Sequence, residues 1–161
     1  MSCFIQSVFS DEIKRRYAQL AQWLCGEINA MSINELTSKV IGAAIEVHKA
    51  LGPGLLESAY EECLCHELDL RKILYKRQKE IPIEYKGIKL DIGYRLDLLV
   101  DNELIVELKA CELIEKIHEA QLLTYLKLTN IEFGLLINFN TPLLKDGLKR
   151  LINTKENEKL K

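Results

Sequence analysis

Residues 94–109, Tyr-Arg-Leu-Asp-Leu-Leu-Val-Asp-Asn-Glu-Leu-Ile-Val-Glu-Leu-Lys, constrain the fold more than any other stretch of the chain. Apolar residues recur at every second position in two short runs, which is the period of a half-buried strand. Asp101 and Asn102 separate the two runs, and both residue types favour turns. The stretch therefore predicts a β-hairpin that carries charges where hairpins usually keep apolar residues.

The pairing register of this hairpin follows from its two apolar stripes. For both stripes to lie on one face of the sheet, Leu98 must lie opposite Val106. A two-residue turn would put them on opposite faces, because a slip of one residue inverts every side chain. We therefore expect a three-residue connection, 101–103, with Asn102 or Glu103 at a positive φ angle, or a bulge that restores the parity.

The same register brings three ionisable groups together. Asp97 falls opposite Glu107, and Lys109 follows two residues later on the same face. Two carboxylates on adjacent strands suit Mg²⁺, which prefers oxygen ligands and keeps positions for water and phosphate. A lysine beside them can orient or help deprotonate an attacking water and stabilise charge on a phosphate. The alternative is a cross-strand ion pair between Asp97 and Lys109 on a solvated face, worth about 0.2–1 kcal/mol.

Composition limits the possible partners. The chain has 161 residues, 48% of them hydrophobic, which is enough for one domain with a substantial core. A formal net charge of −2 argues against a generally basic protein that coats nucleic acid. Residues 71–95 nevertheless carry eight basic and three acidic side chains, a local excess of +5 that could contact phosphates.

Cysteine usage and hydropathy indicate the compartment. The five cysteines have neither disulfide nor zinc-ligand spacing, which is typical of reduced thiols. No apolar run is long enough to cross a membrane, and the first ten residues lack the basic start of a signal peptide. We therefore expect a cytoplasmic protein without a membrane association.

The segment before the hairpin predicts helices. Residues 1–30 form an expected N-terminal extension, in which the helix 10–26 has an apolar stripe that must dock on the body or on a second copy, as in a homodimer. A capping box at Ser32 starts a helix that ends near residues 52–54. A second helix is predicted from about 55 to 71.

Three side chains on these two helices are further candidates. Glu57 lies near the start of the second helix, where its charge favours the helix dipole. Alternatively, Glu57 faces the metal site, and Tyr60 bonds to it or to the substrate. His48, near the end of the first helix, could join them, although a histidine there is more often a cap.

The remaining elements follow from changes of period. Residues 80–93 predict a strand or hairpin, and Pro82 in this segment indicates an edge or strand-start position. A helix follows the main hairpin, and its face carries Gln121 and Tyr125 one turn apart. The apolar run 133–139 predicts a strand covered on both faces. A final helix is predicted after Pro142, packing through Leu143, Leu144, Leu148, Leu151 and Ile152.

The predicted order from residue 32 is thus α-α-β-β-β-α-β-α. The first three strands form an antiparallel meander, and the helix before the fourth strand acts as a crossover that allows parallel pairing. We expect a mixed α/β domain over residues 31–153, with a central mixed sheet of four to five strands flanked by helices. Residues 154–161 are expected to be a solvated tail.

Several motifs in this order resemble those of a known family. Gly54-Leu-Leu-Glu57-Ser-Ala-Tyr60 is similar to the motif that names the GxxExxY family, within the PD-(D/E)XK nuclease superfamily. The resemblance covers about residues 33–153. The other segments that carry it are 42–54, Arg95-Leu-Asp97-Leu-Leu-Val, Val106-Glu107-Leu-Lys109-Ala and Gly134-Leu-Leu-Ile-Asn-Phe139.

The resemblance implies a restriction-endonuclease-like core and a nuclease site. Asp97, Glu107 and Lys109 would be the catalytic triad, and Glu57 the acidic residue from the first core helix. Gln121-Leu-Leu-Thr-Tyr125 is similar to the Gln-x-x-x-Tyr motif of RecB-like nucleases, whose residues support the metal ligands and approach DNA. Leu96 replaces the proline of the superfamily's namesake motif.

The expected reaction is hydrolysis of a phosphodiester by water, with Mg²⁺, or Mn²⁺ as a substitute, held by the site. The expected ligands are Asp97, Glu107 and the Leu108 carbonyl, with Glu57 through water. Gln121, Tyr125, Tyr60, His48 and Arg95 are expected to lie in the second shell or to contact nucleic acid, DNA more than RNA. The alternative function is a non-catalytic module that binds nucleic acid or protein and keeps the fold.

Overall fold

The computed structural model describes residues 31–154, apart from the side chains of residue 85 and residues 89–92. The expected N-terminal extension, its possible role in a homodimer and most of the C-terminal tail lie outside the described residues. The elements are α2 (Ile33–Leu51), α3 (Glu57–Leu70), β1 (Tyr75–Tyr85), β2 (Ile88–Val100), β3 (Leu104–Lys109), α4 (Lys116–Thr129), β4 (Phe133–Asn138), the short 3₁₀ helix η1 (Leu144–Gly147) and β5 (Leu148–Ile152).

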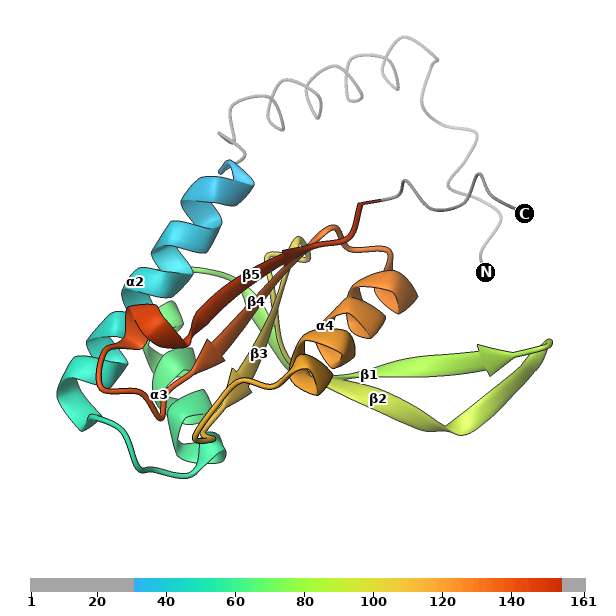
Figure 1. Cartoon of the computed structure of the whole chain (residues 1–161). Helices are drawn as coiled ribbons and strands as arrows, with labels where there is room; N and C mark the ends of the chain where they lie inside the picture. The colour runs from blue at the N-terminus through green and yellow to red at the C-terminus, as the bar shows by residue number, and fades with distance from the viewer. Residues whose placement is uncertain (1–30, 155–161) are drawn as a thin grey trace, which may run out of the picture. The chain divides into compact units, whose positions relative to one another are not determined.

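These elements form a mixed sheet between two layers of helices. Its five strands lie in the order β1-β2-β3-β4-β5. The β3–β4 pair is parallel and the other pairs are antiparallel, as the predicted meander and crossover require. Helix α4 covers one face, and α2 and α3 cover the other (Figure 1). The expected mixed α/β architecture is confirmed.

The main hairpin has the predicted register. Leu98 pairs with Val106, so the apolar stripes of β2 and β3 share one face. The connection 101–103 has three residues, and Asn102 takes a positive φ of 56° as expected. Asp101 also has a positive φ, of 50°, whereas Glu103 does not. An odd connection is therefore achieved without a bulge between the last paired residues.

Strand β2 is longer than the pattern indicated. The segment 80–93, predicted as a strand or hairpin, and the start of the main hairpin belong to one longer hairpin, in which β1 and β2 pair along most of their length. Their far ends project past α4 as a two-stranded ribbon (Figure 1). Strand β1 is at the edge of the sheet, which is where Pro82 can be accommodated without breaking a ladder hydrogen bond.

The prediction of a final helix is wrong. The segment instead forms η1 and then β5, which pairs antiparallel with β4. The apolar spacing of Leu148, Leu151 and Ile152 fits a strand as well as a helix. The open edge of β4 decides the outcome, because pairing there satisfies backbone groups of both strands. Gly147 permits the close turn before β5, since a Cβ there would lie 2.2 Å from the Asn138 carbonyl oxygen.

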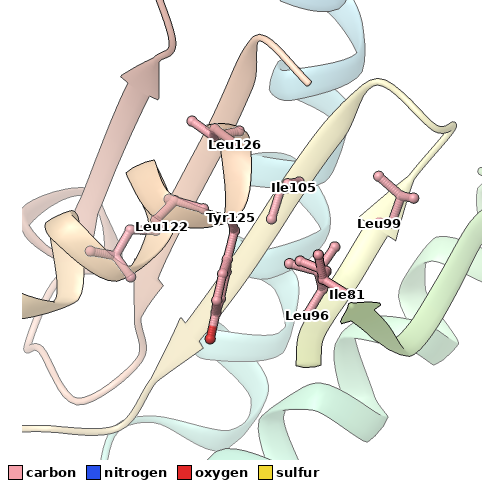
Figure 2. Packing of buried hydrophobic residues seen from close by; sticks show 8 residues of the cluster. Ile81, Leu96, Leu99, Ile105, Leu122, Tyr125 and Leu126 are labelled. Atoms are coloured by element: carbon pink, nitrogen blue, oxygen red, sulfur yellow. The ribbon is translucent and has the colours of Figure 1, made fainter. Parts of the chain in front are cut away.

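The core on the α4 face joins both halves of the sheet. Its buried residues come from four strands and one helix, and α4 contributes Leu122, Tyr125 and Leu126 (Figure 2). The helix begins later than the predicted face suggested, so Leu113 precedes it and is 73% exposed. Tyr125 is buried at 3% exposure. No helix within residues 31–154 is long and apolar enough to cross a bilayer.

Candidate active site

The candidate site lies where β2 and β3 part. Their ladder pairing ends at Leu98 and Val106, and Asp97 and Glu107 are the next residue on each strand. Beyond this point β2 continues in the hairpin with β1, while β3 continues beside β4. The fork therefore leaves backbone groups that no strand satisfies, next to two carboxylates.

Asp97 satisfies one of these backbone groups. Its Oδ2 accepts a hydrogen bond of 2.9 Å from the Leu108 N–H, in place of a ladder bond. Burial raises the pKa of the Asp97 carboxyl, and the Leu108 hydrogen bond and the Lys109 charge oppose that effect without cancelling it. The hydrogen bond fixes the Asp97 carboxylate against β3, the strand that carries Glu107.

Glu107 and Lys109 form a buried ion pair. Glu107 is 2% exposed, and its Oε1 accepts a hydrogen bond of 2.7 Å from the Lys109 Nζ. Burial, together with the charge of Asp97, raises the pKa of Glu107 to about 7, although Lys109 acts to lower it. Burial lowers the pKa of Lys109, but the hydrogen bond and charge of Glu107 outweigh it, so that this pKa is raised overall.

The second oxygen of Glu107 is a candidate metal ligand. Oε2 is buried and accepts no hydrogen bond from any described residue. A buried acceptor without a partner costs about 1–3 kcal/mol, more when it is charged. A hard divalent cation binds such oxygens, so the donor set of Asp97 and Glu107 fits Mg²⁺ or Mn²⁺. No three Asp, Glu, His or Cys side chains in the described part of the chain are close enough to hold a cation by themselves.

Glu57 faces the same site from the first residue of α3. The backbone of Ala110, just after Lys109, lies beside its carboxylate. Partial burial raises the pKa of Glu57, the charge of Lys109 lowers it, and the charge of Asp97 raises it. These interactions place Glu57 near the ion pair, although it does not complete a group of three side-chain donors.

Tyr60 and His48 contact two different loops: Tyr60 bonds the loop before α3, and His48 bonds the loop after β4. The Tyr60 hydroxyl donates to the Gly52 carbonyl at 2.7 Å and accepts from the Leu55 N–H at 3.1 Å. Its single donor is therefore used within the loop. The Tyr60 ring is fully buried and stacks on Phe139 at 4.4 Å. His48 lies 2.8 Å from the Thr141 carbonyl oxygen through Nε2.

Gln121 and Tyr125 meet as predicted. The Gln121 Nε2 donates to the Tyr125 hydroxyl at 2.6 Å. Burial and the charge of Glu107 raise the pKa of Tyr125, which shows that this hydroxyl lies near the ion pair. The ring of Tyr94, 40% exposed, packs against Tyr125 at 5.4 Å and 59°. Arg95 is exposed on β2, opposite Glu80 of β1.

Three residues with defined contacts here were not singled out in the sequence. Glu61, one turn after Glu57, is 8% exposed and accepts hydrogen bonds from Arg77 and Gln78. Asn138 is 1% exposed and bonds both backbone groups of Cys111. The spacing of Glu57 and Glu61, one helical turn apart, was a signal that Glu61 belongs to this region. Gln78 gave no signal, because its role depends on how β1 packs against α3.

Comparison with known proteins agrees with this geometry. The family model described as the PD-(D/E)XK nuclease superfamily matches residues 34–151, which include all the carboxylates named above. Neither a search of curated proteins nor one of solved structures gives a significant match. A family model that spans most of the chain identifies the family. The chain therefore belongs to the PD-(D/E)XK nuclease superfamily.

Proposed function

We propose that this domain hydrolyses phosphodiester bonds of nucleic acid with the help of Mg²⁺, for which Mn²⁺ can substitute. Asp97, Glu107 and the Leu108 carbonyl would hold the ion, and Glu57 would contact it through water. When bound, the ion would lower the pKa of water and neutralise charge on the phosphate. The proximity of the two carboxylates to one lysine, within a nuclease superfamily member, supports this assignment.

The observation that carries the proposal is the state of the Glu107 carboxylate. One oxygen is held by Lys109 at 2.7 Å, and the other is buried without a hydrogen-bond donor among the described residues. A purely structural ion pair would not need to leave an acceptor in this state. An ion ligand is the simplest role for such an oxygen, because desolvated carboxylates bind cations strongly.

The charge of Lys109 supports a role in orienting water. The raised pKa keeps the ammonium protonated at neutral pH. A protonated lysine cannot take a proton from water, so of the two roles considered for it, orientation is favoured over general-base catalysis. Lys109 would hold the attacking water through an N–H donor and stabilise the charge that builds up on the phosphate oxygens.

The substrate would approach from the side of α4. Gln121 and Tyr125 would contact the nucleic acid or hold Glu107 in place, and the exposed Arg95 would contact a phosphate. DNA is the preferred substrate in this proposal, by the resemblance to GxxExxY and RecB-like sequences.

The free thiols Cys63, Cys65 and Cys111 support a cytoplasmic location, and residues 1–30 would mediate a homodimer.

Cleavage of a mixed substrate panel tests the proposal. Wild-type protein is incubated with single- and double-stranded DNA and RNA, with Mg²⁺, Mn²⁺ or EDTA. We expect cleavage that needs the divalent ion and falls at least about 100-fold in Lys109→Ala. Lys145→Ala, which removes an exposed lysine of η1, is the matched control and should keep full activity. Binding of nucleic acid without cleavage under any of these conditions would favour the non-catalytic module.

A further inference from the structure

Gln78 has an unusual backbone for a residue inside a strand. Its φ is +47°, in the left-handed region that residues other than Gly and Asn rarely adopt. The neighbouring pairs Arg77–Leu98 and Lys79–Leu96 place Gln78 opposite Asp97. The irregular residue of β1 thus lies directly across from one of the two site carboxylates. Backbone strain of this kind persists only where the surroundings hold it in place.

The Gln78 side chain connects two carboxylates. Its Nε2 donates to Oε2 of Glu61 at 2.7 Å. The same side chain acts to lower the pKa of Asp97, against the effect of burial, which agrees with its position opposite that residue. An amide nitrogen has two N–H donors, so one group can serve both carboxylates.

Glu61 is itself fixed on its other side. It is 8% exposed, and its Oε1 accepts a hydrogen bond of 2.9 Å from Nε of Arg77. Nη2 of the same guanidinium lies 2.7 Å from Oε2 of Glu62. Arg77 and Glu61 therefore anchor Gln78 to α3. None of these three residues is needed to explain the proposed chemistry directly.

We infer that Gln78 is a positioning residue for Asp97. The hydrogen bond to Glu61 and the positive φ orient the Gln78 side chain, so that one N–H points at the Asp97 carboxylate. This contact keeps the carboxylate oriented toward the metal position. This inference rests on the proposed function. Groups that hold a metal ligand by hydrogen bonds set its orientation and basicity, and their loss typically lowers metal affinity about 10- to 100-fold.

Substitution at Gln78 separates positioning from a merely structural role. Gln78→Gly removes the amide but suits the positive φ, so its melting temperature should lie above that of Gln78→Leu, which also loses the donor to Glu61. Gln78→Leu keeps the bulk of the side chain and removes both donors. We expect the Kd for Mn²⁺, measured by calorimetry, to rise about 10-fold or more in both variants, and kcat to fall while KM for nucleic acid is unchanged.

Lys72→Gly is the matched control, because Lys72 is exposed and has a similar φ of 56° away from the site. It should leave the Kd for Mn²⁺ unchanged. If the wild type binds Mn²⁺ and both Gln78 variants bind it equally well, the inference is wrong and the proposed function stands. If the wild type binds no Mn²⁺ at millimolar concentration, the proposed function fails, and the inference falls with it.

Discussion

The Lys109 ammonium lies 2.7 Å from Oε1 of Glu107, two residues earlier on the same strand. Side chains two apart on a strand share a face, so the contact follows from local geometry once β3 has formed. Burial makes this contact a candidate for chemistry. Glu107 is 2% exposed, and its other oxygen has no hydrogen-bond donor among the described residues. The strand therefore sets the orientation of the pair, and burial raises the pKa of its carboxyl group.

The first prediction concerns the pH dependence of stability without metal. The pKa of Glu107 is raised from its ordinary value of 4.5 to about 7, so the folded protein binds this proton more tightly than the unfolded chain. The resulting stabilisation is complete below pH 4.5 and is lost as the pH rises through 7. In EDTA, the stability of the wild type relative to Glu107→Gln should fall by about 2–3 kcal/mol between pH 5 and pH 8.

Urea unfolding of both proteins at the two pH values measures this difference. Glu107→Gln removes the titrating group, so the comparison isolates the part of the pH dependence that requires Glu107, including its coupling to Asp97 and Lys109. Adding Mn²⁺ at pH 8 should stabilise the wild type and leave the variant almost unchanged. Parallel pH profiles for the two proteins would show that burial does not raise the pKa of Glu107.

The second prediction concerns Asn138, at the end of β4. Its side chain accepts from the N–H groups of Cys111 and Asn140, at 3.2 Å and 3.1 Å, and donates to the Cys111 carbonyl at 2.8 Å. Asn138→Ala would leave these buried or half-buried groups without partners, and should lower the free energy of unfolding by about 2–4 kcal/mol. Asn34→Ala, at an exposed position, should change it by less than about 0.5 kcal/mol.

Denaturant unfolding followed by circular dichroism measures both Asn variants. Because Asn138 holds the chain just after Lys109, Asn138→Ala should also weaken Mn²⁺ binding. An Asn138→Ala protein as stable as Asn34→Ala would show that the clamp on Cys111 contributes nothing to stability.

The third prediction separates structure from chemistry at Tyr60. Tyr60→Phe keeps the stacking on Phe139 but removes the hydroxyl that bonds Gly52 and Leu55. It should lower the free energy of unfolding by about 1–2 kcal/mol and leave the Kd for Mn²⁺ within about threefold of wild type. Thermal unfolding and calorimetry measure the two effects. A large loss of Mn²⁺ affinity with normal stability would instead place the hydroxyl in the site.

The sequence predicts those parts of the fold that depend on strict alternation. The register of β2 against β3 follows from the parity of two apolar stripes and a three-residue connection, and the structure has that register. The segment 148–152 lacks such a constraint, because its apolar residues suit a strand or a helix. Its conformation is decided by the edge of β4, which is a tertiary feature that no local pattern contains.

The candidate site also has one part that the sequence predicts and one part that it does not. Asp97, Glu107 and Lys109 are neighbours along two strands of one hairpin, so their meeting could be predicted from the hairpin alone. Gln78 and Glu61 meet because β1 packs against α3, and glutamine is an unusual residue for a positive φ. Contacts between elements that are distant in the topology leave no periodic signal in the sequence.

Calorimetric titration of the wild type and Asp97→Asn with Mn²⁺ tests the central claim most directly, because it measures the cation site without requiring the right substrate. The account predicts one saturable site in the wild type, with a Kd in the millimolar range or below, and loss of that site in Asp97→Asn. Equal heats of binding in the two proteins, or no binding by the wild type at millimolar Mn²⁺, would contradict it.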